Sequence, residues 1–308
     1  MDLNKLFEKH KNETFIFVKP GGNWGDDLIY LGAEHLAEQH DISFTTMTAE
    51  EFLTTFHTDK VIYLHGGGGY NPWCTGRAYK CLKHACEFTS NIVIQGPCTA
   101  SKDKQFLDSV FTDSLSKLNC KSLYFYTREK TTFNFLQNFP TLTDNSQLLL
   151  DKDTAFYTNI NKLKKKIGSL NERYTLHGYR IDNEASNVAG TKDITKIYLD
   201  PAEEAISFDH WLRIHSNAKR IITNRTHSSI LGFLLDKKTY LFGSKYHKNR
   251  SIFEHTMSAR TTSVTWLNDE EATKFTKRSI LSRLIPSNIH RSYRLTKAIH
   301  ILRGIPDR

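Results

Sequence analysis

One hexapeptide, Asn224-Arg225-Thr226-His227-Ser228-Ser229, combines side chains that bind and protonate anions. An arginine offers a planar fork that matches a carboxylate or a phosphate. A histidine two residues later donates a hydrogen bond or a proton near neutral pH. The segment stands between an expected strand and an expected helix, so Arg225, His227 and Ser228 can meet one small polyanion at a helix N-terminus. The alternative is an arginine that caps a neighbouring carbonyl beside a histidine in the core.

Glycine-rich loops gather in the first third of the chain. Ten of the 16 glycines occur by Gly96, and most of these lie in the segments 21–25 and 66–69. Glycine lets backbone N–H groups approach an anion closely. Asn23, Gly67 and Gly68 are therefore candidates for binding substrate, and Asp26 is a candidate catalytic carboxylate. The alternatives are a tight turn for the four-glycine run and stabilisation of the helix dipole by Asp26.

Further charged residues follow other expected strands. They are Arg128-Glu129, the group Arg180, Asp182 and Glu184, the pair Asp151 and Asp153, and the segment 245–248 with Lys248. Arg128, Arg180 and Lys248 are candidates for binding an anionic substrate. The alternatives are a surface ion pair for Arg128-Glu129 and a solvated face for the Arg180 group.

An alternation of short apolar runs and helical stretches positions these loops. The expected strands cover residues 14–19, 41–46, 60–65, 91–95, 122–127, 147–151, 174–179, 194–199, 220–223 and 239–243. Strands that alternate with helices form parallel sheets, and ligands bind beyond the carboxyl ends of such strands. The sequence predicts an α/β fold in which two Rossmann-like domains with parallel sheets face each other across a cleft.

The chain of 308 residues exceeds what one hydrophobic core normally supports, so more than one domain is expected. The segment 159–173 loses aromatic residues and gains charge, which indicates a domain boundary there. We expect an N-terminal domain at 1–165, a C-terminal domain at 166–265 and a basic helical tail at 266–308.

The net charge of +9 lies almost wholly in that tail. Nine Lys and Arg residues between Lys274 and Arg308 face one acid, Asp307, so residues 1–273 are close to neutral. This distribution argues against nucleic acid as a partner. Apolar residues recur at helical spacing near the C-terminus (Leu295, Ala298, Ile299, Leu302 and Ile305), which is typical of a basic amphipathic helix on an anionic membrane surface. The alternative is that this face packs onto the first domain.

Composition also limits the cellular location of the protein and argues against a bound metal. No apolar run approaches the ~20 residues of a membrane span, and no export signal is visible. The five cysteines lack CxxC spacing, which suits a protein of the reducing cytoplasm. The basic tail adds the option of peripheral contact with the inner face of the membrane. Cys74, Cys81, His84 and Cys86 do not match a zinc-ligand pattern, so no metal is predicted.

Five segments taken together resemble the polysaccharide pyruvyl transferase family. They are GGNWGDDLIYLG (21–32), LHGGGGYN (64–71), TREKTTFNFL (127–136), HGYRIDNEAS (177–186) and the run 217–249. The resemblance implies a two-domain fold like that of GT-B glycosyltransferases, and transfer of a pyruvyl group from phosphoenolpyruvate to two sugar hydroxyls as a cyclic ketal. The sequence departs from the family pattern at Thr226, where an apolar residue is more usual.

The resemblance also implies an acceptor side in the domain 1–165 and a phosphoenolpyruvate-binding side in the domain 166–265, and it assigns residues. The phosphoenolpyruvate-binding arginine of the first domain carries over to Arg128, the Arg-x-His of the second to Arg225 and His227, and the family's Gly-Asp to Gly25-Asp26. On this hypothesis Arg128 and Arg225 hold the carboxylate and phosphate. His227 is the proton donor or a phosphate ligand, and Asp26 is the base for the sugar hydroxyl.

No cofactor beyond the donor is expected, and the acceptor is a saccharide of a surface polysaccharide or its precursor, with a lipid-linked form among the options. Two rival functions remain open on the sequence. A nucleotide-sugar glycosyltransferase of the same architecture would use the glycine loops and the basic site for a diphosphate. A non-catalytic glycan-binding protein would leave Arg225 and His227 without a role.

Overall fold

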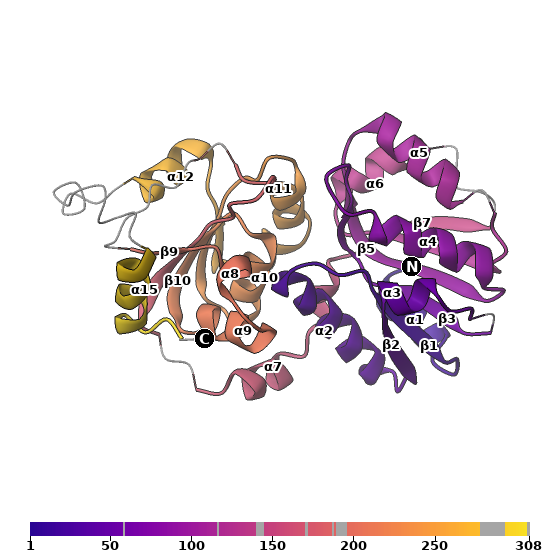
Figure 1. Ribbon diagram of the computed structural model, residues 1–308, viewed down its shortest axis with the longest axis horizontal. Coiled ribbons are helices and arrows are strands. Elements are labelled where there is room, and N and C mark those ends of the chain that lie inside the picture. The colour runs from indigo at the N-terminus through magenta and orange to yellow at the C-terminus, as the bar shows by residue number, and fades with distance from the viewer. Residues whose placement is uncertain are drawn as a thin grey trace. The chain divides into compact units, whose positions relative to one another are not determined.

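A computed structural model describes residues 1–306 apart from 58, 116, 140–144, 170–171, 187, 189–195 and 278–292. The chain divides into two compact units, Met1–Asn159 and Ile160–Arg308 (Figure 1). The charged segment expected to hold the boundary at residue 165 forms helix α7 (Ile160–Ile167), which groups with the second unit. Along the described residues, no helix combines the length and the apolar character needed to cross a bilayer.

The first unit is built on a seven-stranded parallel sheet. Its main path runs β2 (Phe44–Thr48), β1 (Phe15–Lys19), β3 (Val61–Leu64), β5 (Ile92–Ala100), β6 (Ser122–Thr127) and β7 (Ser146–Leu150), and β4 (Gly67–Tyr70) pairs with β5. Every residue of β3 and β5 is buried. The prediction of parallel strands covered on both faces is therefore confirmed for this sheet.

Helices cover both faces of this sheet because successive strand residues point to opposite sides. Phe15, Phe17 and Tyr63 pack on one face with α1 (Leu3–Lys9) and α2 (Trp24–Gln39). Ile16, Val18 and Leu64 belong to the core of the other face. That core is completed by α3 (Ala49–Leu53), α4 (Arg77–Phe88), α5 (Lys104–Ser114) and α6 (Lys130–Leu136).

The second unit is built on a five-stranded parallel sheet. Its order is β12 (Val264–Trp266), β11 (Lys238–Leu241), β10 (Ala218–Thr223), β8 (Tyr174–Gly178) and β9 (Ile197–Leu199). The helical segments of this unit, besides α7, are α8 (Pro201–Glu204), α9 (Phe208–Ser216), α10 (Thr226–Leu234), α11 (Lys248–Ile252), the π-helical turn η2 (Phe253–Met257), α12 (Asp269–Thr276) and α15 (Tyr293–Leu302) (Figure 1).

The two sheets share one topology along their main paths. In each, the first strand of the unit lies between the second and the third, so the chain changes direction between the first and third strands. Such a switch point opens a crevice beyond the carboxyl ends of the two strands, where ligands of open α/β sheets bind. The crevice positions are the loops after β1 and β3 in the first unit and the loops after β8 and β10 in the second.

Two elements differ from the sequence prediction. The four-glycine run, for which a tight turn was the alternative to an anion-binding loop, forms the short strand β4 because Gly67 and Tyr70 pair with Cys98 and Ala100 of β5. Strand β12 was not predicted, since three residues carry too little periodicity. In the tail, which we expect to be helical with a break at Pro286 and an N-cap at Ser287, the structure describes α12 and α15, whereas Pro286 and Ser287 lie outside the described residues.

Candidate functional site

Arg225 lies at the switch point of the second unit, directly after β10. It is the N-cap residue of α10, with extended backbone and no side-chain hydrogen bond to that helix. Its guanidinium turns instead to Asp200, where Nε donates to Oδ1 at 2.8 Å and a terminal nitrogen donates to Oδ2 at 2.5 Å. The arginine fork is therefore held in one orientation at the start of the helix.

Asp200 is a buried residue that the sequence analysis did not single out. Its carboxylate, only 2% exposed, also accepts hydrogen bonds from the backbone of Ala202 and Ile181, both at 3.1 Å. It thereby joins the loops after β8 and β9 to Arg225. A detectable signal existed, because an aspartate between a β-rich run and Pro201 at a first helical position is a capping pattern.

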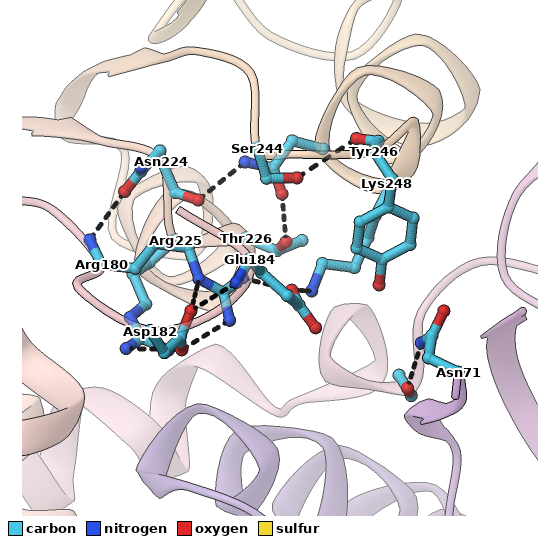
Figure 2. A network of polar contacts seen from close by, with 12 residues as sticks. Asn71, Arg180, Asp182, Glu184, Asn224, Arg225, Thr226, Ser244, Tyr246 and Lys248 are labelled. Carbon is cyan, nitrogen blue, oxygen red and sulfur yellow. Dashed lines mark hydrogen bonds and ion pairs between the residues drawn. The ribbon is translucent and has the colours of Figure 1, made fainter. Parts of the chain in front are cut away.

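A second arginine, Arg180, lies beside Arg225. Its backbone N–H donates to Asn224 Oδ1 at 2.8 Å, and its guanidinium donates to both oxygens of Asp182 at 2.7 and 2.8 Å and to Glu184. Arg180 and Glu184 are buried, so the solvated-face alternative is wrong for both. Figure 2 shows this network of side chains from the loops after β8 and β10.

Asp182 joins the two arginines electrostatically. Its Oδ2 lies 3.2 Å from a terminal nitrogen of Arg225, and its side chain is 38% exposed. Burial opposes ionisation of this carboxyl, but the hydrogen bonds and charge of Arg180, with the charge of Arg225, outweigh burial and lower its pKa to about 2. The carboxylate of Asp182 thus occupies a place beside two guanidinium groups, where a ligand anion would also be stable.

Lys248 and its neighbour Asn249 complete the network from the start of α11. Lys248 Nζ contacts Glu184 at 2.5 Å and lies 5.2 Å from the centre of the Tyr246 ring. Asn249 donates to the carbonyl of Asn224 at 2.7 Å and accepts from Thr226 Oγ1 at 2.6 Å. The predicted residues Arg180, Arg225 and Lys248 are therefore brought together, and three carboxylates (Asp182, Glu184 and Asp200) balance their charges.

His227 and Ser228 lie in the first turn of α10. His227 is partly exposed, whereas Thr226 and Ser228 on either side are buried. The hydroxyl of Ser228 pairs with His215 Nε2 at 2.8 Å, and His215 Nδ1 lies 2.8 Å from the Trp211 carbonyl. Burial lowers the pKa of His215 to about 4, so this imidazole is neutral, donates through Nδ1 and accepts from Ser228. The side chain of Ser228 is therefore bonded inside the unit, while His227 is partly exposed.

In the first unit, Asp26 lies between the loops that follow β1 and β3. Its carboxylate accepts from the backbone N–H of Asn23 at 2.8 Å, and Asn23 Oδ1 accepts from Gly25, which completes a capping box for α2. A Cβ on Gly22 would lie 2.2 Å from one carboxylate oxygen, and a Cβ on Gly67 would lie 3.5 Å from the other. Both glycines have positive φ angles, +150° and +135°. The glycine loops thus make room for Asp26.

Asp27, next to Asp26, was also missed by the sequence analysis. Burial raises the pKa of its carboxyl to about 6, with the nearby charge of Lys19 acting against that rise. Tyr30, one turn further along α2, donates from its hydroxyl to the Gly21 carbonyl at 2.8 Å. The carbonyl of Gly68 accepts from the side chain of Asn71 at 2.5 Å, which fixes the other glycine loop.

Arg128 follows β6, two strands along the sheet from β3. It is 1% exposed and donates to Thr99 Oγ1 at 2.8 Å and to the buried Asp153 at 2.6 Å. Glu129 is 0% exposed and caps α6 through the backbone of Thr132. The alternative of a surface ion pair between Arg128 and Glu129 is therefore wrong. Within the first unit, Arg128 and Asp26 belong to different loops at the carboxyl edge of the sheet.

Comparisons with known proteins identify the family of this chain. Its fold is similar to that of a functionally uncharacterised protein from Klebsiella pneumoniae, with a TM-score of 0.64 and 18% identity over 86% of this chain and 96% of that one. The C-terminal domain of glucosamine-fructose-6-phosphate aminotransferase from Francisella tularensis also aligns, over 98% of this chain and 87% of that one. At 13% identity and a TM-score of 0.25, this alignment does not indicate a shared fold. No curated protein matches. A family model described as polysaccharide pyruvyl transferase matches residues 23–246, and the chain therefore belongs to that family.

Proposed function

We propose that the protein transfers the pyruvyl group of phosphoenolpyruvate to two hydroxyls of a sugar in a surface polysaccharide or its precursor. The observation that carries this proposal is the presence of an oriented Arg225 and a partly exposed His227 at the first turn of α10, in a member of this family. A guanidinium fork and a helix N-terminus bind phosphate and carboxylate groups.

Donor binding uses the network of the second unit. Phosphoenolpyruvate carries close to three negative charges, whereas the guanidinium groups of Arg180 and Arg225 already contact Asp182. The donor therefore takes the place of the half-exposed Asp182, while the buried Asp200 keeps Arg225 oriented. Lys248 adds a third cation to this side of the site. We carry a donor contact over to Arg128 from the family resemblance, and because Arg128 is buried against Asp153, that contact requires a change around Asp153.

The proposed reaction joins two hydroxyl oxygens of the sugar to one carbon, C2 of the donor. His227 protonates the methylene carbon of the donor, positive charge develops at C2, and the first sugar hydroxyl forms a C–O bond there as Asp26 accepts its proton. The second hydroxyl then attacks C2, the C–O bond to phosphate breaks, and phosphate leaves as the ring closes. The proton of the second hydroxyl restores the histidine, and the proton held by Asp26 passes to the departing phosphate. One donor and two hydroxyls therefore give one ketal and one hydrogen phosphate.

The proposal places Asp26 on the acceptor side and His227 on the donor side, in an arrangement of the GT-B type. It needs no cofactor besides the donor, no metal and no nucleic acid. The acceptor is a saccharide, and a lipid-linked carrier is one form in which it could be presented to a cytoplasmic enzyme.

Thermal unfolding with and without phosphoenolpyruvate tests the donor. A ligand at 100 times its dissociation constant stabilises by about 2.7 kcal/mol, which moves a melting curve measurably. We expect a shift with phosphoenolpyruvate and none with UDP-sugars. A shift with a UDP-sugar alone would replace the proposal by a nucleotide-sugar glycosyltransferase.

The variant Arg225→Lys tests the site. Lysine keeps the charge but loses the bidentate fork, so we expect turnover to fall at least 100-fold, as phosphate released in the presence of acceptor, with an unchanged circular dichroism spectrum. The exposed Arg250→Lys, whose parent side chain is 53% exposed and pairs with Glu254, is the matched control. Near-normal turnover in Arg225→Lys would remove this arginine from the site.

A further inference from the structure

The helix α15 presents its apolar side chains to solvent. Leu295 is 42% exposed, Ile301 is 38% exposed and Leu302 is 86% exposed. Leu295, Ala298 and Leu302 follow the i, i+3, i+7 spacing of one helix face, and all three are exposed. Among the residues of this helix from 294 to 302, the buried one is instead His300, at 8% exposure. A soluble helix normally has the opposite arrangement, with polar side chains outward.

The contacts that hold α15 fix this orientation within the second unit. The chain turns at Gly304, whose φ is +95°, and the N–H of Ile305 returns to the His300 carbonyl at 3.0 Å. The Pro306 carbonyl accepts from His210 Nε2 of α9 at 3.0 Å, and Ile305 is buried. The described end of the tail therefore contacts α9 of the second unit at Pro306.

Basic residues surround this apolar face. Arg294 and Arg303 of the same segment are exposed, and Lys297 is partly exposed. The sequence contains no acidic residue between Lys274 and Pro306.

One further apolar side chain lies close to the same contact. Ile206 is 51% exposed, and its backbone N–H lies 3.3 Å from Nδ1 of His210, the residue that holds Pro306. The surface formed by Ile206 and the outward face of α15, with Arg294, Lys297 and Arg303, combines exposed apolar groups with positive charge. We call it the α15 surface.

We propose that the α15 surface docks on an anionic lipid bilayer. The apolar side chains of Leu295, Ile301 and Leu302 enter the boundary between head groups and acyl chains, and the lysine and the arginines remain at the level of the lipid phosphates. The excess of positive charge favours a phosphate-rich surface over a second copy of this chain, which would bring like charges together. The inference does not depend on the identity of the donor.

Vesicle co-sedimentation of the full chain tests the proposal. We expect binding to vesicles that contain 30% phosphatidylglycerol in phosphatidylcholine, at least ten-fold weaker binding to phosphatidylcholine alone, and a loss of binding as salt is raised. The double variant Ile301→Ser with Leu302→Ser should bind the anionic vesicles at least ten-fold more weakly than the parent. Phe56→Ser in the first unit, where the parent side chain is 68% exposed, is the matched control and should bind like the parent.

Three results would overturn the inference: no binding to anionic vesicles, equal binding to both vesicle types, or unchanged binding of the double variant. A concentration-dependent dimer that the double variant abolishes would identify a second copy as the occupant instead. The stabilisation by phosphoenolpyruvate should be the same in the double variant and the parent, so loss of lipid binding and failure of the proposed donor are separate results.

Discussion

Asp200 holds the guanidinium of Arg225 at both of its carboxylate oxygens, with the donors at 2.8 and 2.5 Å. The same carboxylate accepts the N–H groups of Ile181 and Ala202. A buried aspartate therefore joins three loops at the switch point of the second sheet and fixes the direction in which the arginine presents its remaining donors. Asp200 is a positioning residue, since it acts through Arg225.

We expect Asp200→Asn to weaken donor binding more than turnover. Removing one partner of a buried ion pair costs about 3–5 kcal/mol, and the isosteric amide reduces this loss to about 2 kcal/mol by keeping some hydrogen bonds. Because Arg225 loses its orientation, KM for the donor should rise about ten-fold while kcat changes less. Steady-state kinetics and urea unfolding measure both effects. Asp209→Asn, where the parent side chain is 63% exposed and pairs with Lys166, is the control, and an unchanged KM in Asp200→Asn would contradict the positioning role.

Asp182→Asn should have the opposite effect on anion binding. Its carboxylate competes with any ligand for Arg180 and Arg225, and the amide carries no charge. The affinity for inorganic phosphate should therefore rise about two- to five-fold, which corresponds to the ~0.5–1 kcal/mol of a partly exposed ion pair. Isothermal titration calorimetry measures this change. A lower affinity would show that Asp182 contributes to ligand binding instead of competing with it.

One substitution separates the two roles of Asp26, the cap of α2 and the proposed base for the sugar hydroxyl. In Asp26→Asn the amide oxygen can still accept from the Asn23 N–H, so stability should fall by no more than ~1 kcal/mol. Loss of the base should reduce kcat about 10²–10⁴-fold. Asp103→Asn, which alters a cap of α5 in the same unit, should leave kcat unchanged. If Asp26→Asn turns over like the parent, Asp26 serves the helix alone.

The buried pair of His215 and Ser228 predicts a pH dependence of stability. The pKa of His215 is about 4 in the folded state and 6.5 in the unfolded state, so protonation favours unfolding. This contribution is complete above pH 6.5 and is lost progressively as the pH falls towards 4, by about 3 kcal/mol in total. Urea unfolding between pH 7 and pH 4 should show this loss in the parent and a flatter profile in His215→Gln. Parallel profiles for the two proteins would show that His215 is not responsible.

Much of the fold was predictable because parallel strands buried on both faces are short, apolar and rich in β-branched and aromatic residues. Val61–Leu64 and Ser122–Thr127 carry that signal strongly. Strand β4 carries none, since Gly67–Tyr70 has three glycines and pairs only through contacts with β5. Helix α7 was interpreted as a boundary segment because its four lysines leave a single buried residue, Leu163, which is too few to give a helical pattern of apolar residues.

The candidate site was predictable by residue type and position, but not by partner. The rule that ligands bind beyond strand ends singled out Arg180, Arg225 and Lys248, which the structure brings together. It could not show that Asp200 holds Arg225, because the two are 25 residues apart and meet only when β9 and β10 flank β8. Likewise, Arg128 meets Asp153 only once β6 and β7 pair.

The balance of charge in the network of the second unit has a consequence for kinetics. Arg180, Arg225 and Lys248 lie within contact distance of Asp182, Glu184 and Asp200, so their fields cancel within a few ångströms of the site. Long-range attraction accelerates encounter only where one sign of charge dominates, and that acceleration falls with ionic strength. The network itself therefore does not draw an anion in from a distance. On the proposed function, its contribution to recognition begins at contact, when the donor displaces the Asp182 carboxylate from Arg180 and Arg225.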